Sequence, residues 1–154
     1  MRIAIGADHG GFDLKPVLIR HLRSAGHRVF DVGTWSSDPC DYPAIGAQVA
    51  QAVSRRRAQR GILLCKSGGG MAIVANKFLG VRAVVCQGPG SARHAREHNS
   101  ANILVLGAEG LEQREAVGIL RVWLKTPFAG GRHARRVRQI RQIEQNSRRA
   151  SSHV

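Results

Sequence analysis

Short apolar segments alternate with longer amphipathic segments along most of this chain, and that alternation limits the possible fold more than any other feature. Such a pattern is typical of parallel strands joined by crossover helices. Strands are expected at residues 2–7, 28–32, 61–64, 82–86 and 103–106. We therefore predict an α/β fold in which five β/α units build one parallel sheet covered by helices.

The segments between the expected strands carry apolar residues at helical spacing. These positions are, in chain order, Leu14, Val17, Leu18, Leu22 and Ala25, then Ile45, Val49 and Val53, and later Ala116, Leu120, Trp123 and Leu124. Shorter helices are expected at 71–77 and 91–98. A last helix beginning near Gly131 shows a narrow apolar stripe of Val137, Ile140 and Ile143 among arginines. So narrow a stripe suits docking on a neighbour such as another subunit.

The chain has 154 residues, which suits a single domain. We expect that domain at residues 1–146 and a basic, disordered tail at 147–154. No apolar run approaches the roughly 20 residues of a membrane helix, and the N-terminus lacks the apolar core of a secretory signal, so a cytoplasmic protein without membrane contact is expected. Cys40, Cys65 and Cys86 lack the spacing of a disulfide framework or a zinc site, so reduced thiols are expected.

The formal net charge of +14 raises the question of a polyanionic partner. Arginines are concentrated between positions 132 and 149, whereas aromatic residues for base stacking are sparse throughout the chain. Nucleic acid is therefore not the expected partner, although a polyanion-binding C-terminus stays open. The alternative is a solvated basic face.

Polar residues follow two of the expected strands directly. Asp8 and His9 come after the first strand, and Cys65 comes after the third. Because ligands of open parallel sheets gather at the carboxyl ends of the strands, we expect these three side chains to converge on one crevice. The alternatives are a capping turn for Asp8 and His9 and a small buried hydrophobic residue for Cys65.

A glycine run, Ser67-Gly68-Gly69-Gly70-Met71, follows Cys65 and Lys66. It matches neither the Walker A pattern nor the spaced glycines of dinucleotide folds, so it is weak evidence for a nucleotide. Glycines permit positive φ angles, and several N–H groups can then face one point. We predict a nest that stabilises negative charge on an oxygen next to a carbon being deprotonated, with a flexible turn as the alternative.

Two further groups of residues are candidates for ligand contact. Arg132 and Arg136 are four residues apart and would form a two-pronged phosphate clamp on one helical face, unless they are merely solvated. His98 and Asn99 end the predicted helix at 91–98, where either can serve as a cap. His94 and His98 have the i, i+4 spacing of metal ligands, but no carboxylate stands at supporting spacing, so no metal is expected.

These motifs together resemble the type B ribose-5-phosphate isomerases, the family that also contains the galactose-6-phosphate isomerase subunits. The matching segments are Gly6-Ala7-Asp8-His9-Gly10-Gly11-Phe12, Gly33-Thr34-Trp35-Ser36-Ser37, Asp41-Tyr42-Pro43, Cys65 with Ser67-Gly68 and Gly70, Ala75-Asn76-Lys77-Phe78, Val81-Arg82-Ala83, His98-Asn99, and Gly130-Gly131-Arg132-His133 with Arg136. They extend from Arg2 to about Glu144, in the family order.

The resemblance implies a Rossmann-like three-layer α/β/α sandwich and a homodimer or dimer of dimers with active sites shared between subunits. It implies aldose–ketose isomerisation of a phosphorylated sugar, most plausibly ribose 5-phosphate to ribulose 5-phosphate, without metal or cofactor. The resemblance implies that Cys65 is the base and that Ser67, with the backbone of Gly68, Gly69, Gly70 and Met71, forms the enediolate cradle. It implies that Asp8 contacts the reacting hydroxyls and that His98 assists ring opening. It also implies that Asn99 and Tyr42 contact the sugar and that His9, Arg132 and Arg136 bind the phosphate.

Two positions depart from the family pattern. Lys66 stands where the cysteine-containing branch usually has glycine, and Glu109 stands where many members carry a phosphate-contacting arginine. We expect Lys66 either to tune Cys65 or to reach the ligand, unless it simply points into solvent. The departures keep two alternatives open: an isomerase for a hexose or tetrose phosphate, and a homologue that binds a sugar phosphate without catalysis.

Overall fold

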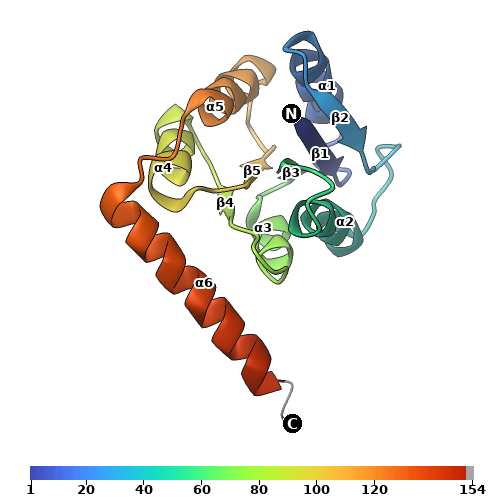
Figure 1. Cartoon of the computed structure of the whole chain (residues 1–154). Coiled ribbons are helices and arrows are strands. Elements are labelled where there is room, and N and C mark those ends of the chain that lie inside the picture. The colour runs from blue at the N-terminus through green and yellow to red at the C-terminus, as the bar shows by residue number, and fades with distance from the viewer. Residues whose placement is uncertain (152–154) are drawn as a thin grey trace.

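In the computed structural model, which describes residues 1–151, a single five-stranded sheet has the order β2-β1-β3-β5-β4 and all paired strands are parallel (Figure 1). The strands are β1 (Arg2–Ala7), β2 (Arg28–Asp31), β3 (Arg60–Cys65), β4 (Ala83–Val85) and β5 (Ile103–Gly107). The helices are α1 (Leu14–Ser24), α2 (Tyr42–Ser54), α3 (Gly69–Ala75), α4 (Pro89–Asn99), α5 (Gln113–Lys125) and α6 (Gly131–Ser151). The predicted α/β fold is confirmed.

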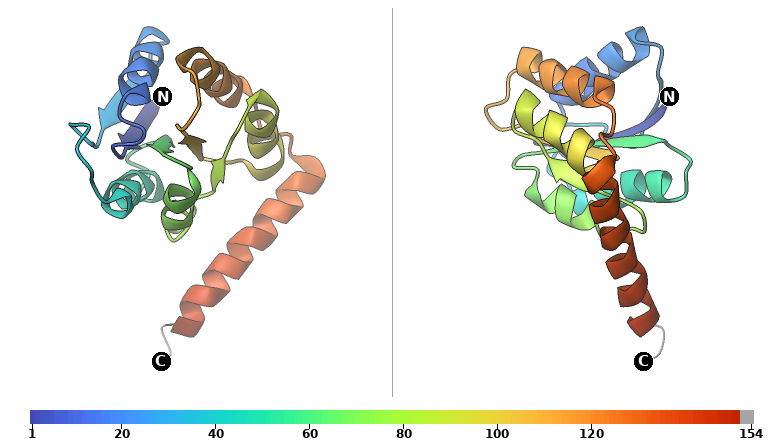
Figure 2. Two further views of the ribbon diagram at one scale, coloured as in Figure 1. Left: turned by 180° about the vertical axis from the view of Figure 1, so that it is seen from behind. Right: turned by 60° about the vertical axis from the view of Figure 1, so that its left-hand side comes forward.

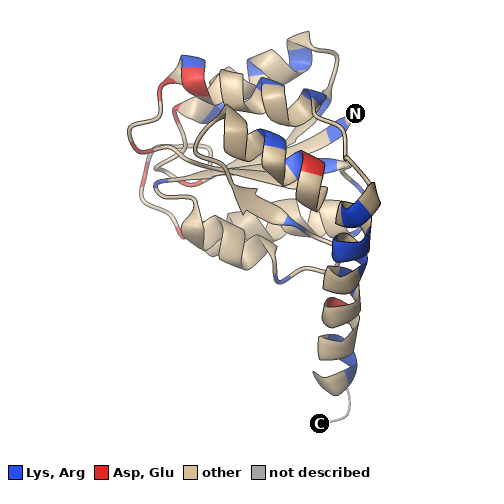
Figure 3. Cartoon of the chain, turned by 90° about the vertical axis from the view of Figure 1, so that its left-hand side faces the viewer, with Lys and Arg blue, Asp and Glu red and all other residues tan. Residues whose placement is uncertain are grey.

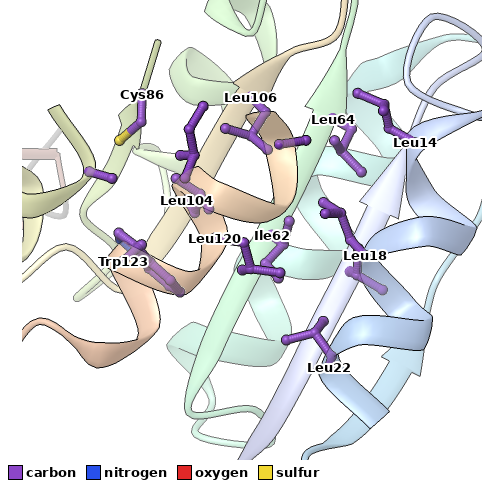
Figure 4. Close-up of a cluster of buried hydrophobic side chains, with 14 of the residues drawn as sticks. Leu14, Leu18, Leu22, Ile62, Leu64, Cys86, Leu104, Leu106, Leu120 and Trp123 are labelled. Atoms are coloured by element: carbon purple, nitrogen blue, oxygen red, sulfur yellow. The ribbon is translucent and has the colours of Figure 1, made fainter. Parts of the chain in front are cut away.

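Helices cover both faces of the sheet and produce the expected three layers (Figure 2). Helices α1, α4 and α5 pack on one face, where Leu18, Leu22, Ile62, Leu104 and Trp123 are fully buried (Figure 4). Helices α2 and α3 pack on the other face against a second apolar cluster. The central strands β1, β3 and β5 are buried on both faces, which explains why they appear in the sequence as short continuous apolar runs, whereas the edge strand β2 is partly exposed.

Helix boundaries differ from the predicted ones where glycine and proline stand at helix ends. Helix α3 begins at Gly69 rather than at residue 71, directly after Gly68, whose φ of 85° ends the preceding loop. Helix α4 begins at Pro89 rather than at residue 91, because proline fits the first helical turn and needs no N–H partner. The Ser91 hydroxyl then accepts hydrogen bonds from the N–H groups of Gln87 and Gly88.

Helix α6 leaves the body of the protein beside α4 and projects away from the sheet, with many basic residues along it (Figures 1 and 3). Of its apolar stripe, Val137 is buried, whereas Ile140 and Ile143 are 48% and 66% exposed. The helix continues through Ser151, past the predicted tail boundary at 147. No glycine or proline interrupts it there, and the Ser147 hydroxyl donates to the carbonyl of Ile143. Residues 152–154 of the predicted tail lie outside the described residues.

Within residues 1–151, no helix is both long enough and apolar enough to cross a membrane.

Candidate functional site

The strand order places the switch point of the sheet between β1 and β3. From β1 the chain moves outward to β2 on one side, and from β3 onward it builds the other half of the sheet, so the direction of winding reverses between these two strands. In such sheets the loops at this reversal separate and leave space for a ligand at the carboxyl ends of the strands. Asp8 directly follows β1, as expected from the sequence, and Cys65 is the last residue of β3 rather than the first residue after it.

The Cys65 thiol is buried, at 4% exposure, and it faces a hydrogen-bond donor. The backbone N–H of Gly68 points at Cys65 Sγ, with a nitrogen–sulfur distance of 3.1 Å. A donor aimed at sulfur stabilises the thiolate over the thiol. Gly68 can aim its N–H in this way because its φ of 85° lies in the left-handed region.

The second buried thiol has the opposite surroundings. Cys86 follows β4 and belongs to the apolar cluster on the other face of the sheet. Its sulfur lies 3.7 Å from the carbonyl of Val84, an acceptor that favours the protonated form. Burial raises the pKa of the Cys86 thiol to about 11. Of these two buried cysteines, Cys65 is therefore the one whose sulfur accepts a hydrogen bond from a backbone N–H group.

The loop after β1 packs directly against the start of the glycine run. The Asp8 carboxylate is 5% exposed, and its Oδ1 accepts hydrogen bonds from the N–H groups of Gly10 and Gly11, at 2.8 and 3.2 Å. A side chain at Gly10 would meet the backbone nitrogen of Lys66 at 2.9 Å. The two loops are thus in close contact, which brings the Asp8 carboxylate and the residues after Cys65 to the same part of the sheet edge.

His9 is exposed at the same edge, and a hydrogen bond sets its tautomer. The N–H of Cys40 donates to His9 Nδ1 at 3.2 Å, so in this arrangement the ring proton is on Nε2. An N–H donor is then available for an anionic ligand. The predicted turn role and the predicted ligand role of Asp8 and His9 are therefore compatible, because each residue uses only one of its two polar side-chain atoms in the fold.

Tyr42, the first residue of α2, closes the other side of the glycine run. A side chain at Gly70 would lie 2.4 to 2.6 Å from the Tyr42 ring. The phenol therefore rests directly on the Gly70 backbone, and only glycine permits this contact. Residues of β1, β3 and α2 that are far apart in sequence consequently surround the same glycine run.

The two departures from the family pattern are partners. Lys66 Nζ lies 3.3 Å from Glu109 Oε1, and both side chains are well exposed. The backbone supports this pairing, because the N–H of Glu109 donates to the carbonyl of Lys66 at 3.1 Å. The charge that enters the loop is thus offset by the charge that replaces arginine. Contact between Lys66 and a ligand stays a prediction.

The remaining predicted site residues lie at the opposite edge of the sheet. Helix α4 starts at the carboxyl end of β4 and runs back, so His98 and Asn99 in its last turn lie near the amino ends of the strands. The Asn99 carbonyl accepts a hydrogen bond from Arg82 Nε, and Arg82 immediately precedes β4. Strand β5 alone separates the two edges by about 13 Å, given a rise of about 3.3 Å per residue.

Arg132 and Arg136 belong to this second group. They lie on the first turns of α6, which are tied to the end of α4 by a hydrogen bond from the N–H of Ala129 to the carbonyl of Glu97. The structure therefore brings together Asp8, His9, Tyr42 and Cys65 at one edge. It places His98, Asn99, Arg132 and Arg136 together at the other.

No role was predicted for His133 from the sequence, although the structure places it in this second group. Its ring is 8% exposed and stacks on the ring of His98, with centroids 4.1 Å apart. The only sequence signal was its position next to Arg132 in a segment that resembles the family. Among residues 1–151, no three His, Cys, Asp or Glu side chains gather closely enough to hold a metal ion.

The fold is that of a doubly wound α/β protein, and Asp8 and Cys65 lie at the switch point of its parallel sheet, where such folds bind ligands. Comparison with known proteins makes the assignment specific. The chain belongs to the Ribose/Galactose Isomerase family, whose model matches residues 3–140. The resemblance recognised in the sequence is thereby confirmed.

Similar proteins cover nearly the whole chain. Ribose-5-phosphate isomerase B of Escherichia coli is 46% identical over 144 residues, which are 94% of this chain and 97% of that protein. D-erythrulose-4-phosphate isomerase of Pectobacterium atrosepticum is 39% identical over 152 residues, covering 96% and 98%. The solved structure of Clostridium thermocellum ribose-5-phosphate isomerase B has a TM-score of 0.93 at 46% identity, covering 96% of this chain and 99% of that one.

Proposed function

We propose that this protein interconverts ribose 5-phosphate and ribulose 5-phosphate, with Cys65 as the base that moves the proton between C1 and C2. The observation that carries this proposal is the Gly68 N–H directed at Cys65 Sγ beside the buried Asp8 carboxylate. The similarity to ribose-5-phosphate isomerases B over almost the whole chain supports the choice of sugar.

The proposed reaction needs no electron acceptor. The Cys65 thiolate takes the C2 proton of the open-chain aldose, and the carbonyl oxygen at C1 becomes negatively charged. The N–H groups of Gly69, Gly70 and Met71 and the Ser67 hydroxyl stabilise this enediolate, whereas the N–H of Gly68, predicted for the same cradle, is directed at Cys65 Sγ. The hydroxyl at C2 then passes its proton to O1, assisted by Asp8, while the thiol returns its proton to C1.

The phosphate and the sugar ring require the second group of residues. His9 supplies one N–H donor, whereas the two arginines and the His98 and Asn99 side chains lie at the other edge of the same chain. We infer that a second copy brings Arg132, Arg136, His98 and Asn99 to the crevice. His98 would assist ring opening, while Asn99 and Tyr42 would hold the sugar oxygens.

The exposed apolar side of α6 supports a homodimer or a dimer of dimers. Ile140 and Ile143 line a groove of about 660 Å³ between α6 and the region around β4, together with Val81 and Val84. Glu144 Oε1 accepts a hydrogen bond from the N–H of Gly80 across this region, which fixes the helix against the body. A second copy would cover isoleucines that water otherwise surrounds.

A tetrose phosphate is the second candidate substrate. The specific observation in its favour is the 39% identity to a D-erythrulose-4-phosphate isomerase. The exchange of the usual arginine for Glu109, now paired with Lys66, alters the charge beside the loop. Relative kcat/KM values for pentose, tetrose and hexose phosphates distinguish these substrates.

The role of Cys65 is tested against a matched thiol. Cys65→Ala should reduce kcat with ribose 5-phosphate by about 100-fold to 10,000-fold, the range for loss of a general base. Cys86→Ala should retain activity, because that thiol lies on the other face of the sheet and stays protonated. Substantial turnover by Cys65→Ala would remove Cys65 as the base. Binding of ribose 5-phosphate by the wild-type protein without isomerisation would indicate a non-catalytic homologue.

A further inference from the structure

Three imidazole rings stack at the junction of α4 and α6. The His98 ring is the middle one. Its centroid lies 4.1 Å from that of His133, with the planes 4° apart, and 5.0 Å from that of His94, with the planes 10° apart. We call His94, His98 and His133 the imidazole column.

The column has a buried end and an exposed end. His133 comes from the first turn of α6 and is 8% exposed, while His94 lies one helical turn before His98 on α4 and is open to solvent. Parallel stacked rings direct their nitrogen lone pairs along separate planes, so they do not converge on one metal ion. The arrangement instead fixes the plane of the middle ring, a torsion that is otherwise broad for histidine.

The surroundings of the buried ring of the column favour its neutral form. Burial lowers the pKa of His133, and the neighbouring His98, Arg132 and Arg136 lower it further, while the Glu97 carboxylate acts in the opposite direction. His133 Nδ1 is buried without a hydrogen-bond partner in the described part of the chain. A neutral His133 can pack flat on His98 without adding a positive charge next to it.

We propose that His133, with His94 on the opposite side, is a positioning residue that fixes the His98 ring for opening of the cyclic sugar. This inference rests on the proposed function. In ring opening the C1–O4 bond breaks, O1 loses its proton as the aldehyde forms, and the ring oxygen gains one. A group that moves such protons must present its ring nitrogen along a defined line. The column sets that line, and neither His133 nor His94 needs to touch the sugar.

The test separates ring opening from proton transfer at carbon. Ribose 5-phosphate is a furanose and must open, whereas ribulose 5-phosphate is open-chain because its O5 carries the phosphate. Turnover of ribose 5-phosphate therefore requires both steps, and incorporation of solvent deuterium at C1 of ribulose 5-phosphate requires only the second. The wild-type protein must first show both signals, and their absence would refute the proposed function rather than the column.

His133→Ala should lower kcat for ribose 5-phosphate by about 10-fold to 100-fold, the cost of a misplaced catalytic group. It should change deuterium exchange by less than about twofold, since proton transfer by Cys65 does not use the column. His133→Phe should restore most of the turnover, because a flat ring is retained, and His94→Ala should cause a smaller loss. Circular dichroism and elution volume control for folding and assembly.

Three results would overturn the proposal. Equal losses of turnover and exchange in His133→Ala would indicate a general structural role, and unchanged turnover would show that His98 needs no support. Failure of His133→Phe to exceed His133→Ala would show that stacking is not the property that matters.

Discussion

If each active site takes Cys65 from one copy and the arginine pair from another, two inactive variants should restore each other. The first variant is Cys65→Ala. The second is Arg132→Ala combined with Arg136→Ala. Heterodimers carrying one chain of each kind can be isolated with two different affinity tags. One of their two sites then contains both defects, and the other contains neither.

The expected magnitude follows from the positions of these residues. Cys65 pairs with Gly107 at the carboxyl end of the sheet, while Arg132 lies beside the amino end, at least about 13 Å away along β5. Loss of two charge-assisted phosphate contacts, each worth about 1.5–3 kcal/mol, should reduce kcat/KM of the second homodimer by about 100-fold or more. The isolated heterodimer should nevertheless show about half of the wild-type kcat/KM, since one of two equivalent sites is intact.

A matched control places all the changes in one chain and pairs that chain with a wild-type copy. With shared sites, each site of this heterodimer lacks either Cys65 or the arginine pair, so it should be inactive. A steady-state isomerase assay at substrate concentrations below KM compares the two arrangements. The reasoning is refuted if the arrangement with separated changes is inactive and the control retains half of the activity.

Three further predictions concern the fold that holds the site. Lys15 is 3% exposed, and its Nζ lies 2.7 Å from Asp31 Oδ1. Lys15→Met should therefore lower the free energy of unfolding, measured by urea denaturation, by about 3 kcal/mol. A decrease of less than about 1 kcal/mol would contradict a stabilising buried ion pair. Gly68→Ala should lower the free energy of unfolding by about 1–2 kcal/mol, because the φ angle of Gly68 is 85° and the new Cβ would lie 3.0 Å from Val85 Cγ1. The kcat of this variant should fall by more than the loss of folded protein explains. The pKa of His133 is lowered in the folded protein, so the unfolded chain binds this proton at a higher pH, and the stability from this group is present above pH 6.5 and lost below it. His133→Phe should therefore reduce the loss of stability at acid pH, measured as urea midpoints at several pH values. An unchanged loss in this variant would assign the pH dependence to other groups.

Strand and helix positions could be predicted from the sequence because parallel strands buried on both faces leave continuous apolar runs. Their ends were harder to place, since loop geometry decides them. Gly68 in the left-handed region starts α3 two residues early, and Pro89 does the same for α4. The tail prediction rested on composition alone, and α6 is helical through Ser151 because nothing in Arg148, Arg149 or Ala150 interrupts a helix.

The convergence of Asp8, His9 and Cys65 followed from the rule that residues after parallel strands share one edge. That rule contains no information on partners across loops, so the sequence did not reveal the pairing of Lys66 with Glu109. The stacking of His133 on His98 was hidden for a similar reason. This stacking depends on how the start of α6 packs beside the end of α4, and hydrophobic periodicity does not encode that packing.

The choice between two buried cysteines shows what the structure adds to a motif. Cys65 ends β3 and Cys86 directly follows β4 of the same sheet, and both are nearly inaccessible. Burial by itself favours the protonated form of a thiol, so it does not distinguish the two cysteines. At Cys65, however, a backbone N–H approaches sulfur at 3.1 Å, whereas the nearest partner of Cys86 is a carbonyl at 3.7 Å. Because a donor favours a thiolate and an acceptor favours a thiol, the orientation of one peptide group, set by the φ angle of Gly68, is what favours Cys65 over Cys86 as the proposed base.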